Sequence, residues 1–326
     1  MEALMKNPKV RMRDPKAVED KLVRLIEEGT ENMIVFADFD YTLSRYHDGN
    51  GIRCSSSHGV FDTAAERTDK QLYEKLHAMN EKYMAIETCH LMSMEEKIPH
   101  MIEWWTRSHE KIVESKLHKE VVEEIVQDSK IVMRDRSHEL FELLDAKEVP
   151  LVIFSAGVGT VIDIYLRQRL PRKELPKNVH IISNMMIFDE ENICINFTEP
   201  LIHVFCKNGS AVRHDDPFFH DFSERHNVVL MGDSLGDLEM HVGVERSGIV
   251  LKIGFLNHKF DTMLDKYLAE GAYDIVILDD QSVDIPLAIF DQVPSVAKAN
   301  GNGVLKNEEQ QKAEDEELPK AFNVPA

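Results

Sequence analysis

Residues 34–40 (IVFADFD) constrain the fold more than any other stretch of the chain. Their continuous apolar run predicts a buried strand of the parallel type. Asp38 and Asp40 follow it directly, and because side chains alternate along a strand, both carboxylates are expected on one face. In open α/β sheets, ligands bind at this carboxyl end. Two adjacent acids repel each other unless a cation or a divided role separates their charges. A simple turn capped by Asp38 is the alternative interpretation of the pair.

The rest of the chain alternates strand and helix patterns around this first strand. Further apolar runs occur at 149–154, 179–183, 228–231, 249–253 and 275–278, with helical patterns between several of them. Residues 186–189 and 193–197 have the pattern of a hairpin. Repeated βα units predict an α/β fold, a doubly wound and mostly parallel sheet with helices on both faces.

One long block lacks strand patterns. Between residues 59 and 129, apolar side chains recur at three- and four-residue steps, and Ser93 with Glu96 forms the capping-box pattern of a helix start. We therefore expect a core made of residues 1–50 and 130–297, interrupted by a helical insertion at 51–129. Residues 298–326 are acidic with few apolar anchors, which predicts a disordered tail.

Charge and cysteine content narrow the function. The formal charge is −20, which argues against a nucleic-acid polymer or an anionic membrane as partner but allows a small phosphorylated substrate. Four scattered cysteines without a C-x-x-C pair indicate reduced thiols. The first 20 residues lack the apolar segment of a signal peptide, and no apolar run is long enough to span a bilayer. We expect a cytoplasmic protein, with a monomer as the default.

Polar residues follow several of the predicted strands. Besides Asp38 and Asp40, these are Ser155, Lys207, Asp233 and Asp237. If the strands are parallel neighbours, their carboxyl ends meet in one crevice. Carboxylate oxygens together with water are typical ligands of magnesium. Each residue alone has an ordinary interpretation as a turn former or a surface charge, but together they predict an active site.

These motifs resemble the four motifs of the haloacid-dehalogenase superfamily of aspartate-nucleophile phosphatases. They are residues 38–43, Ser155 after its strand, Lys207, and residues 232–237. A more specific resemblance, over about residues 20–295, is to the cytosolic 5′-nucleotidase III (pyrimidine 5′-nucleotidase) family. It rests on residues 83–87, 103–109, 154–157 and 202–205.

The resemblance implies a role for each motif residue. Asp38 would be the nucleophile that forms an aspartyl-phosphate, and Asp40 the general acid and then the general base. Mg²⁺ would be held by Asp38, by the backbone carbonyl of Asp40 and by Asp233. Lys207 would balance the charge of the phosphoryl group.

Two more positions would bind the phosphate, and one would support the site. The hydroxyl of Ser155 and the N–H of Ala156 would donate to phosphate oxygens. Asp237 would support the loop from behind the metal ligands, or else stabilise a helix N-terminus.

The helical insertion lies where this superfamily carries a cap domain, which closes over the substrate. By resemblance, Glu87 and Ser108 would recognise the nucleoside. Trp105 would stack on the base or pack in the cap core, and both roles stay open. The Trp104-Trp105 pair is more similar to the branch of the family that accepts 7-methylguanosine monophosphate.

The resemblance thus predicts a magnesium-dependent 5′-nucleotidase acting on nucleoside monophosphates, namely UMP, CMP and also 7-methyl-GMP, with phosphotransfer to nucleosides as a related activity. One alternative is a phosphatase of the same fold that acts on another small metabolite, which Glu87, Ser108 and the tryptophan pair disfavour. The other is a non-catalytic binding protein, which the complete set of acids disfavours.

Overall fold

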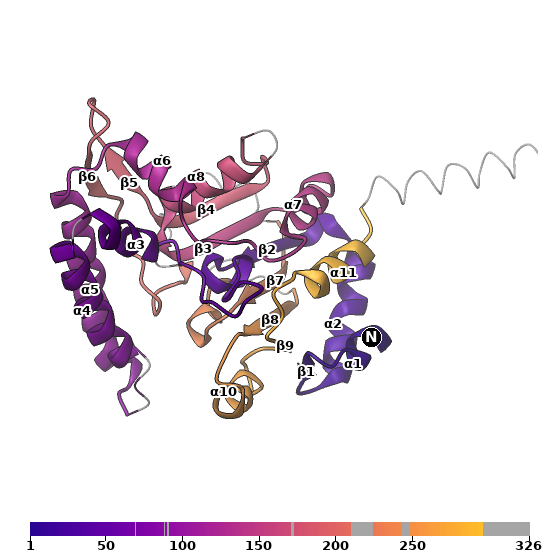
Figure 1. Ribbon diagram of the computed structural model, residues 1–326. Helices are drawn as coiled ribbons and strands as arrows, with labels where there is room; N and C mark the ends of the chain where they lie inside the picture. The colour runs from indigo at the N-terminus through magenta and orange to yellow at the C-terminus, as the bar shows by residue number, and fades with distance from the viewer. Residues whose placement is uncertain are drawn as a thin grey trace, which may run out of the picture.

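The computed structural model describes residues 1–68, 70–87, 89, 91–170, 173–209, 224–242 and 248–295. A seven-stranded sheet runs through the molecule in the order β1-β9-β8-β7-β2-β3-β4 (Figure 1). Its strands are β1 (Val10–Met12), β2 (Met33–Ala37), β3 (Leu151–Val158), β4 (Val179–Asn184), β7 (Asn227–Gly232), β8 (Val250–Leu256) and β9 (Ile275–Leu278). All neighbours are parallel except β1 and β9. The mostly parallel sheet is confirmed; the three-residue edge strand β1 was too short to predict.

Strand β2 is buried on both faces. Met33, Val35 and Ala37 belong to one hydrophobic core, and Ile34 and Phe36 belong to the other. The first core is completed by α2 (Pro15–Glu28), α7 (Ser137–Ala146), α8 (Gly159–Arg169) and α11 (Asp284–Gln292), and the second by α10 (Phe260–Tyr267). Burying each large apolar side chain stabilises the fold by about 1.5–3 kcal/mol. The sheet therefore has cores on both faces, as the sequence predicted.

The boundaries of β3 differ from expectation. Strand β3 continues from Phe154 to Val158, with a register shift against β4 over these residues, so Ser155 and Ala156 lie within the strand. The amide of Asn184 donates to the carbonyls of Ala156 and Gly157 in this part of β3, at 2.8 and 3.2 Å. Helix α2 begins at Pro15, where the side chain of Asp14 caps it.

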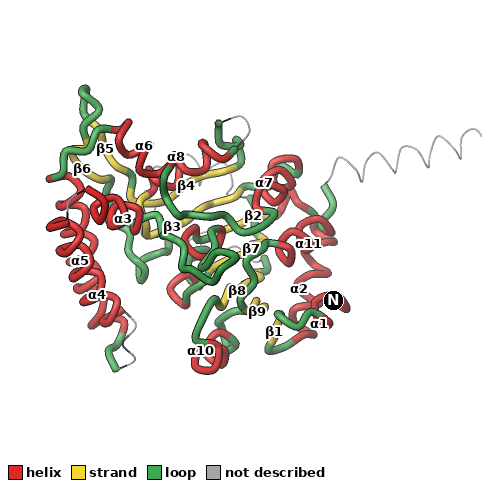
Figure 2. The backbone as a smooth tube through the Cα atoms, viewed as in Figure 1, coloured by secondary structure: helices red, strands yellow, loops and turns green. Residues whose placement is uncertain are grey.

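The predicted helical block consists of α3 (Gly59–Thr68), α4 (Lys70–Glu87), α5 (Met94–Glu114) and α6 (Lys119–Gln127). Helices α4 and α5 pack together at the left edge of the view, away from the centre of the sheet (Figure 2). The predicted capping box of Ser93 and Glu96 opens α5. Helix α5 also contacts β6 (Cys194–Phe197), which forms the predicted hairpin with β5 (Met186–Phe188).

The remaining elements are α1 (Glu2–Lys6) and short helical turns. The predicted acidic tail at 298–326 lies outside the described residues. Within the described ranges, no helix has both the length and the apolar character needed to cross a membrane.

Candidate active site

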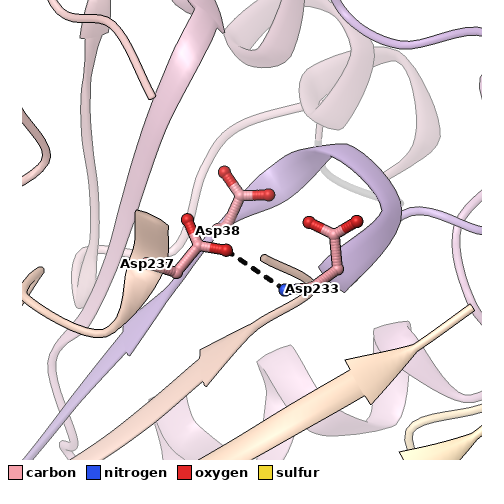
Figure 3. A group of neighbouring side chains, drawn as sticks. All are labelled: Asp38, Asp233 and Asp237. Atoms are coloured by element: carbon pink, nitrogen blue, oxygen red, sulfur yellow. Dashed lines mark hydrogen bonds between the residues drawn. The ribbon is translucent and has the colours of Figure 1, made fainter. Parts of the chain in front are cut away.

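Three aspartates converge where two neighbouring strands end. Asp38 follows β2 and Asp233 follows β7, and these strands are paired in parallel up to Ala37 and Met231. Asp237 ends a short 3₁₀ turn, Leu235–Asp237. One carboxylate oxygen from each aspartate lies within 4.8 Å of the others, and Figure 3 shows the three side chains pointing toward a common space. The predicted convergence of Asp38 and Asp233 is therefore present.

Lys207 joins two of these acids. Its buried ammonium donates to Asp38 Oδ1 at 2.5 Å and to Asp237 Oδ1 at 2.7 Å. The neighbouring carboxylates raise the pKa of Lys207 above its usual range, although burial alone would lower it. Lys207 is therefore a fixed cation beside Asp38.

Asp237 has a supporting role. Its Oδ2 accepts hydrogen bonds from the N–H groups of Asp233 and Ser234, at 3.2 and 2.9 Å, and from Ser234 Oγ at 3.0 Å. Together with its bond to Lys207, these contacts occupy both oxygens. Asp237 thus holds the loop that carries Asp233 and forms a capping box with Ser234. Its role in the active site stays a prediction.

The carboxylate of Asp233, unlike that of Asp237, accepts no hydrogen bond from the described residues. In the described part of the chain it has no hydrogen-bond donor or ion-pair partner, while Tyr267 fixes its backbone by donating to its carbonyl. Burial raises the pKa of Asp233 well above its usual value, and burial raises the pKa of Asp38 to about 7 despite Lys207. A bound cation would stabilise both ionised carboxylates.

Ser57 holds Asp40 and was not predicted as a site residue. The N–H and Oγ of this buried serine each donate to the Asp40 carboxylate at 2.6 Å. Gly157 lies opposite, and a Cβ there would come within 1.9 Å of Ser57 Oγ and 2.9 Å of Asp40 Oδ2. Only glycine permits this approach. The sequence offered no way to choose Ser57 from three consecutive serines.

The phosphate-binding candidates and Trp105 meet on β3. Ser155 Oγ is buried and accepts from the Gly157 N–H at 3.1 Å, so its own hydrogen remains available to a ligand. The carbonyl of Ala156 accepts from Trp105 Nε1 at 2.6 Å. The Trp105 ring is buried in an edge-to-face contact with Trp104. Trp105 is therefore packed between Trp104 and β3, and both roles that the sequence left open, stacking on a base and packing in the cap core, stay predictions.

The helical block brings Glu87 and Ser108 to this region. Burial raises the pKa of Glu87 to about 7, whereas the charges of Lys207 and Lys97 lower it. Ser108 is buried on α5, and its Oγ has no hydrogen-bond partner among the described residues. Such a hydroxyl is costly unless a ligand pairs with it.

His58 is a further candidate that the sequence did not single out. Its ring centroid lies 6.2 Å from that of Trp105, directly after Ser57 in the chain. Burial lowers the pKa of His58, so its imidazole is neutral at neutral pH.

A mostly parallel sheet whose strand ends gather an aspartate pair, a lysine and a further aspartate, beside a helical insertion, is the arrangement that the resemblance to haloacid-dehalogenase phosphatases implies. The solved structure of cytosolic 5′-nucleotidase IIIB bound to cytidine is similar, with 31% identity, a TM-score of 0.78, and coverage of 89% of this chain and 94% of that one.

Sequence comparison gives the family. The profile described as pyrimidine 5′-nucleotidase (UMPH-1) matches residues 41–294, and the chain belongs to this family. A putative cytosolic 5′-nucleotidase 3 from Caenorhabditis elegans is 43% identical over 90% of this chain and 78% of its own length. A 7-methylguanosine phosphate-specific 5′-nucleotidase from Homo sapiens is 37% identical over 85% of this chain and 89% of its own length. The predicted family, fold and class of enzyme are confirmed.

Proposed function

We propose that this protein hydrolyses nucleoside 5′-monophosphates to nucleoside and phosphate, with Asp38 as the nucleophile and magnesium as the cofactor. The observation that carries the proposal is the pairing of a buried Asp38 with Lys207, beside an Asp233 carboxylate that has no donor of its own in the described structure. This arrangement concentrates charge where a phosphoryl group can be bound and attacked.

The residues present fit a magnesium ion. The carboxylates of Asp38 and Asp233 lie within reach of one ion, and hard oxygen ligands suit it. Asp237 also lies close enough to be a ligand, but its two carboxylate oxygens already accept hydrogen bonds from Lys207 and from the N–H of Ser234. We therefore assign the ligands to Asp38, Asp233 and the carbonyl of Asp40. When bound, Mg²⁺ would polarise a phosphate oxygen and offset the repulsion between the acids.

The chain's own groups would carry out the two half-reactions. In the first, an oxygen of Asp38 attacks phosphorus, the bond from phosphorus to the 5′-oxygen breaks, and Asp40 donates a proton to that oxygen. In the second, Asp40 takes a proton from water, which attacks the aspartyl-phosphate and releases phosphate and Asp38. A nucleoside hydroxyl in place of water would give phosphotransfer.

The neighbouring groups would hold the phosphoryl group during both steps. The ammonium of Lys207, the hydroxyl of Ser155 and the N–H of Ala156 stabilise its oxygens.

Substrate choice would lie with the helical insertion. We assign residues 51–129 to a cap over a core of 1–50 and 130–297. The unpaired hydroxyl of Ser108 and the carboxylate of Glu87 would recognise the base. Relatives named for 7-methylguanosine phosphate and a similar structure bound to cytidine support both a methylated purine and pyrimidines as bases. A cation over an aromatic ring is favourable, which suits 7-methylguanine near Trp105.

We further propose that the protein acts in the cytosol as a monomer. The described cysteines are all free thiols, which agrees with a reducing compartment. The name of the relative from Caenorhabditis elegans points to the same compartment.

A screen of phosphate release tests the proposal. UMP, CMP, 7-methyl-GMP, phosphoserine and a sugar phosphate are each incubated with the wild type and with Asp38→Asn, with and without Mg²⁺. We expect release from the nucleotides alone, dependent on Mg²⁺ and abolished in Asp38→Asn. Release from the other phosphoesters but from no nucleotide would contradict the proposed substrate class. Near-normal turnover by Asp38→Asn would contradict the mechanism.

A further inference from the structure

Among the described residues, Arg134 is the largest side chain that is fully buried, with 1% of its surface exposed. It lies where the chain returns from the helical block to the sheet. This returning segment runs beside the residues that follow the aspartate pair, because Arg45 N donates to Val132 O at 2.7 Å and Arg134 N donates to Leu43 O at 3.0 Å. The buried guanidinium is therefore placed behind the turn that carries Asp38 and Asp40.

The donors of this guanidinium are directed at neutral oxygens. Nε donates to the carbonyl of Thr42 at 2.6 Å, and Nη2 donates to the carbonyl of Tyr41 at 2.5 Å and to Asn257 Oδ1 at 2.9 Å. Nη1 donates to the carbonyl of Asp280. The group also lies 4.2 Å from the ring centroid of Phe255. Among the described residues, no carboxylate forms an ion pair with the Arg134 guanidinium. This buried cation instead donates most of its hydrogen bonds to backbone carbonyls.

The turn that these bonds hold is unusual. Tyr41 has a φ of +65°, a left-handed conformation that costs a non-glycine residue about 1–2 kcal/mol. Its carbonyl accepts a second hydrogen bond, from Asn257 Nδ2 at 3.0 Å. Asn257 also accepts a hydrogen bond from Arg134, so both side chains bind the carbonyl of Tyr41 and each other. Tyr41 directly follows Asp40.

We propose that Arg134 is a positioning residue for phosphoryl transfer, which acts with Asn257 by fixing the turn at Tyr41 and Thr42. The role rests on the proposed function. Through this turn Arg134 sets the direction of the Asp38 and Asp40 carboxylates, and it joins that turn to the return segment of the helical block. The planar fork of arginine suits the task, because one ammonium cannot reach carbonyls spread around it in the same geometry.

The test compares Arg134→Lys with Arg136→Lys. Both substitutions keep the positive charge and replace an arginine of the same segment. Arg136, however, is exposed, and its ion-pair partners among the described residues are the surface acids Glu139 and Asp284. kcat and KM are measured for a nucleotide and for p-nitrophenyl phosphate, which needs no recognition of a base. The temperature is kept well below the unfolding midpoint of the least stable variant.

We expect Arg134→Lys to lower kcat by about 10- to 100-fold for both substrates, because small misplacements of reacting groups have effects of this size. KM should change by less than about threefold, because the proposed role of Arg134 is to hold the turn through the carbonyls of Tyr41 and Thr42 and not to bind substrate. Arg136→Lys should match the wild type. Asn257→Ala keeps Arg134 and replaces Arg134→Lys in the test if that variant does not fold. It should show the same loss in kcat without a matching change in KM.

The inference is overturned if folded Arg134→Lys keeps the kcat of Arg136→Lys, or if Asn257→Ala keeps the kcat of the wild type. It is also overturned if the variants lose only thermal stability. A wild type without activity on any phosphate monoester would instead overturn the proposed function, and the role of Arg134 with it. The two failures are therefore distinguishable.

Discussion

Ser57→Ala is the sharpest test of how the acid/base residue is held. Ser57 makes two hydrogen bonds to the Asp40 carboxylate, one from its N–H and one from its hydroxyl, both at 2.6 Å. The substitution removes only the second bond and leaves a methyl group in a fully buried position. The backbone bond persists, so the variant isolates the contribution of one side-chain hydroxyl to the orientation of Asp40.

The expected magnitude follows from that single bond. A hydrogen bond to a charged group contributes about 1.5–3 kcal/mol. If this energy is lost from the transition state, in which Asp40 must donate its proton, kcat falls by roughly 10- to 100-fold, since about 1.4 kcal/mol corresponds to a factor of ten. KM should hardly change, because Ser57 is directed at Asp40 and not at the substrate.

The assay is phosphate release at saturating nucleotide, with Ser55→Ala as the matched control. Ser55 belongs to the same loop, and its N–H donates to the carbonyl of Lys130, so its backbone bond survives the substitution. Gly157→Ala places a Cβ 1.9 Å from Ser57 Oγ and should displace that hydroxyl. The same Cβ would lie 2.9 Å from Asp40 Oδ2, so Gly157→Ala should lower kcat at least as much as Ser57→Ala. Equal kcat values for Ser57→Ala and Ser55→Ala would refute the reasoning.

Three further predictions concern the metal, the base and stability. Adding Mg²⁺ should raise the unfolding midpoint of the wild type and not that of Asp233→Asn, because a ligand stabilises only the state that binds it. Removing Mg²⁺ with a chelator should stop phosphate release. An equal shift of the unfolding midpoint in both proteins would show that Asp233 is not a metal ligand. Burial raises the pKa of Glu87 to about 7, so this carboxylate gradually loses its charge as the pH drops through 7. Over that range kcat/KM for 7-methyl-GMP should fall in the wild type but less steeply in Glu87→Gln. Parallel pH profiles would exclude this role. Hydrogen bonds from Asn227, Arg24 and His226 lower the pKa of Glu28 to about 2, so ionised Glu28 stabilises the folded state above its usual pKa of 4.5 and loses this effect as the pH falls toward 2. Glu28→Gln should thus lower stability by about 1–2 kcal/mol at pH 7, with a difference that narrows in acid; a difference independent of pH in calorimetry would contradict this assignment.

Local patterns in the sequence determined the architecture and the centre of the site. The apolar run of β2 and the two aspartates after it are neighbours in the chain, so the position of Asp38 at a strand end follows from periodicity alone. The same holds for Asp233 after β7 and for the capping box that opens α5. Parallel pairing of these strands then brings the acids together.

The tertiary structure alone decided what holds those acids in place. Ser57 reaches Asp40 across 17 positions of the chain, Trp105 reaches Ala156 across 51, and Arg134 reaches Thr42 across 92. No local periodicity encodes such contacts, because each depends on how loops and the helical block fold back on the sheet. The sequence therefore determined which residues could perform the chemistry, and only the packing of distant segments decided which side chains orient them.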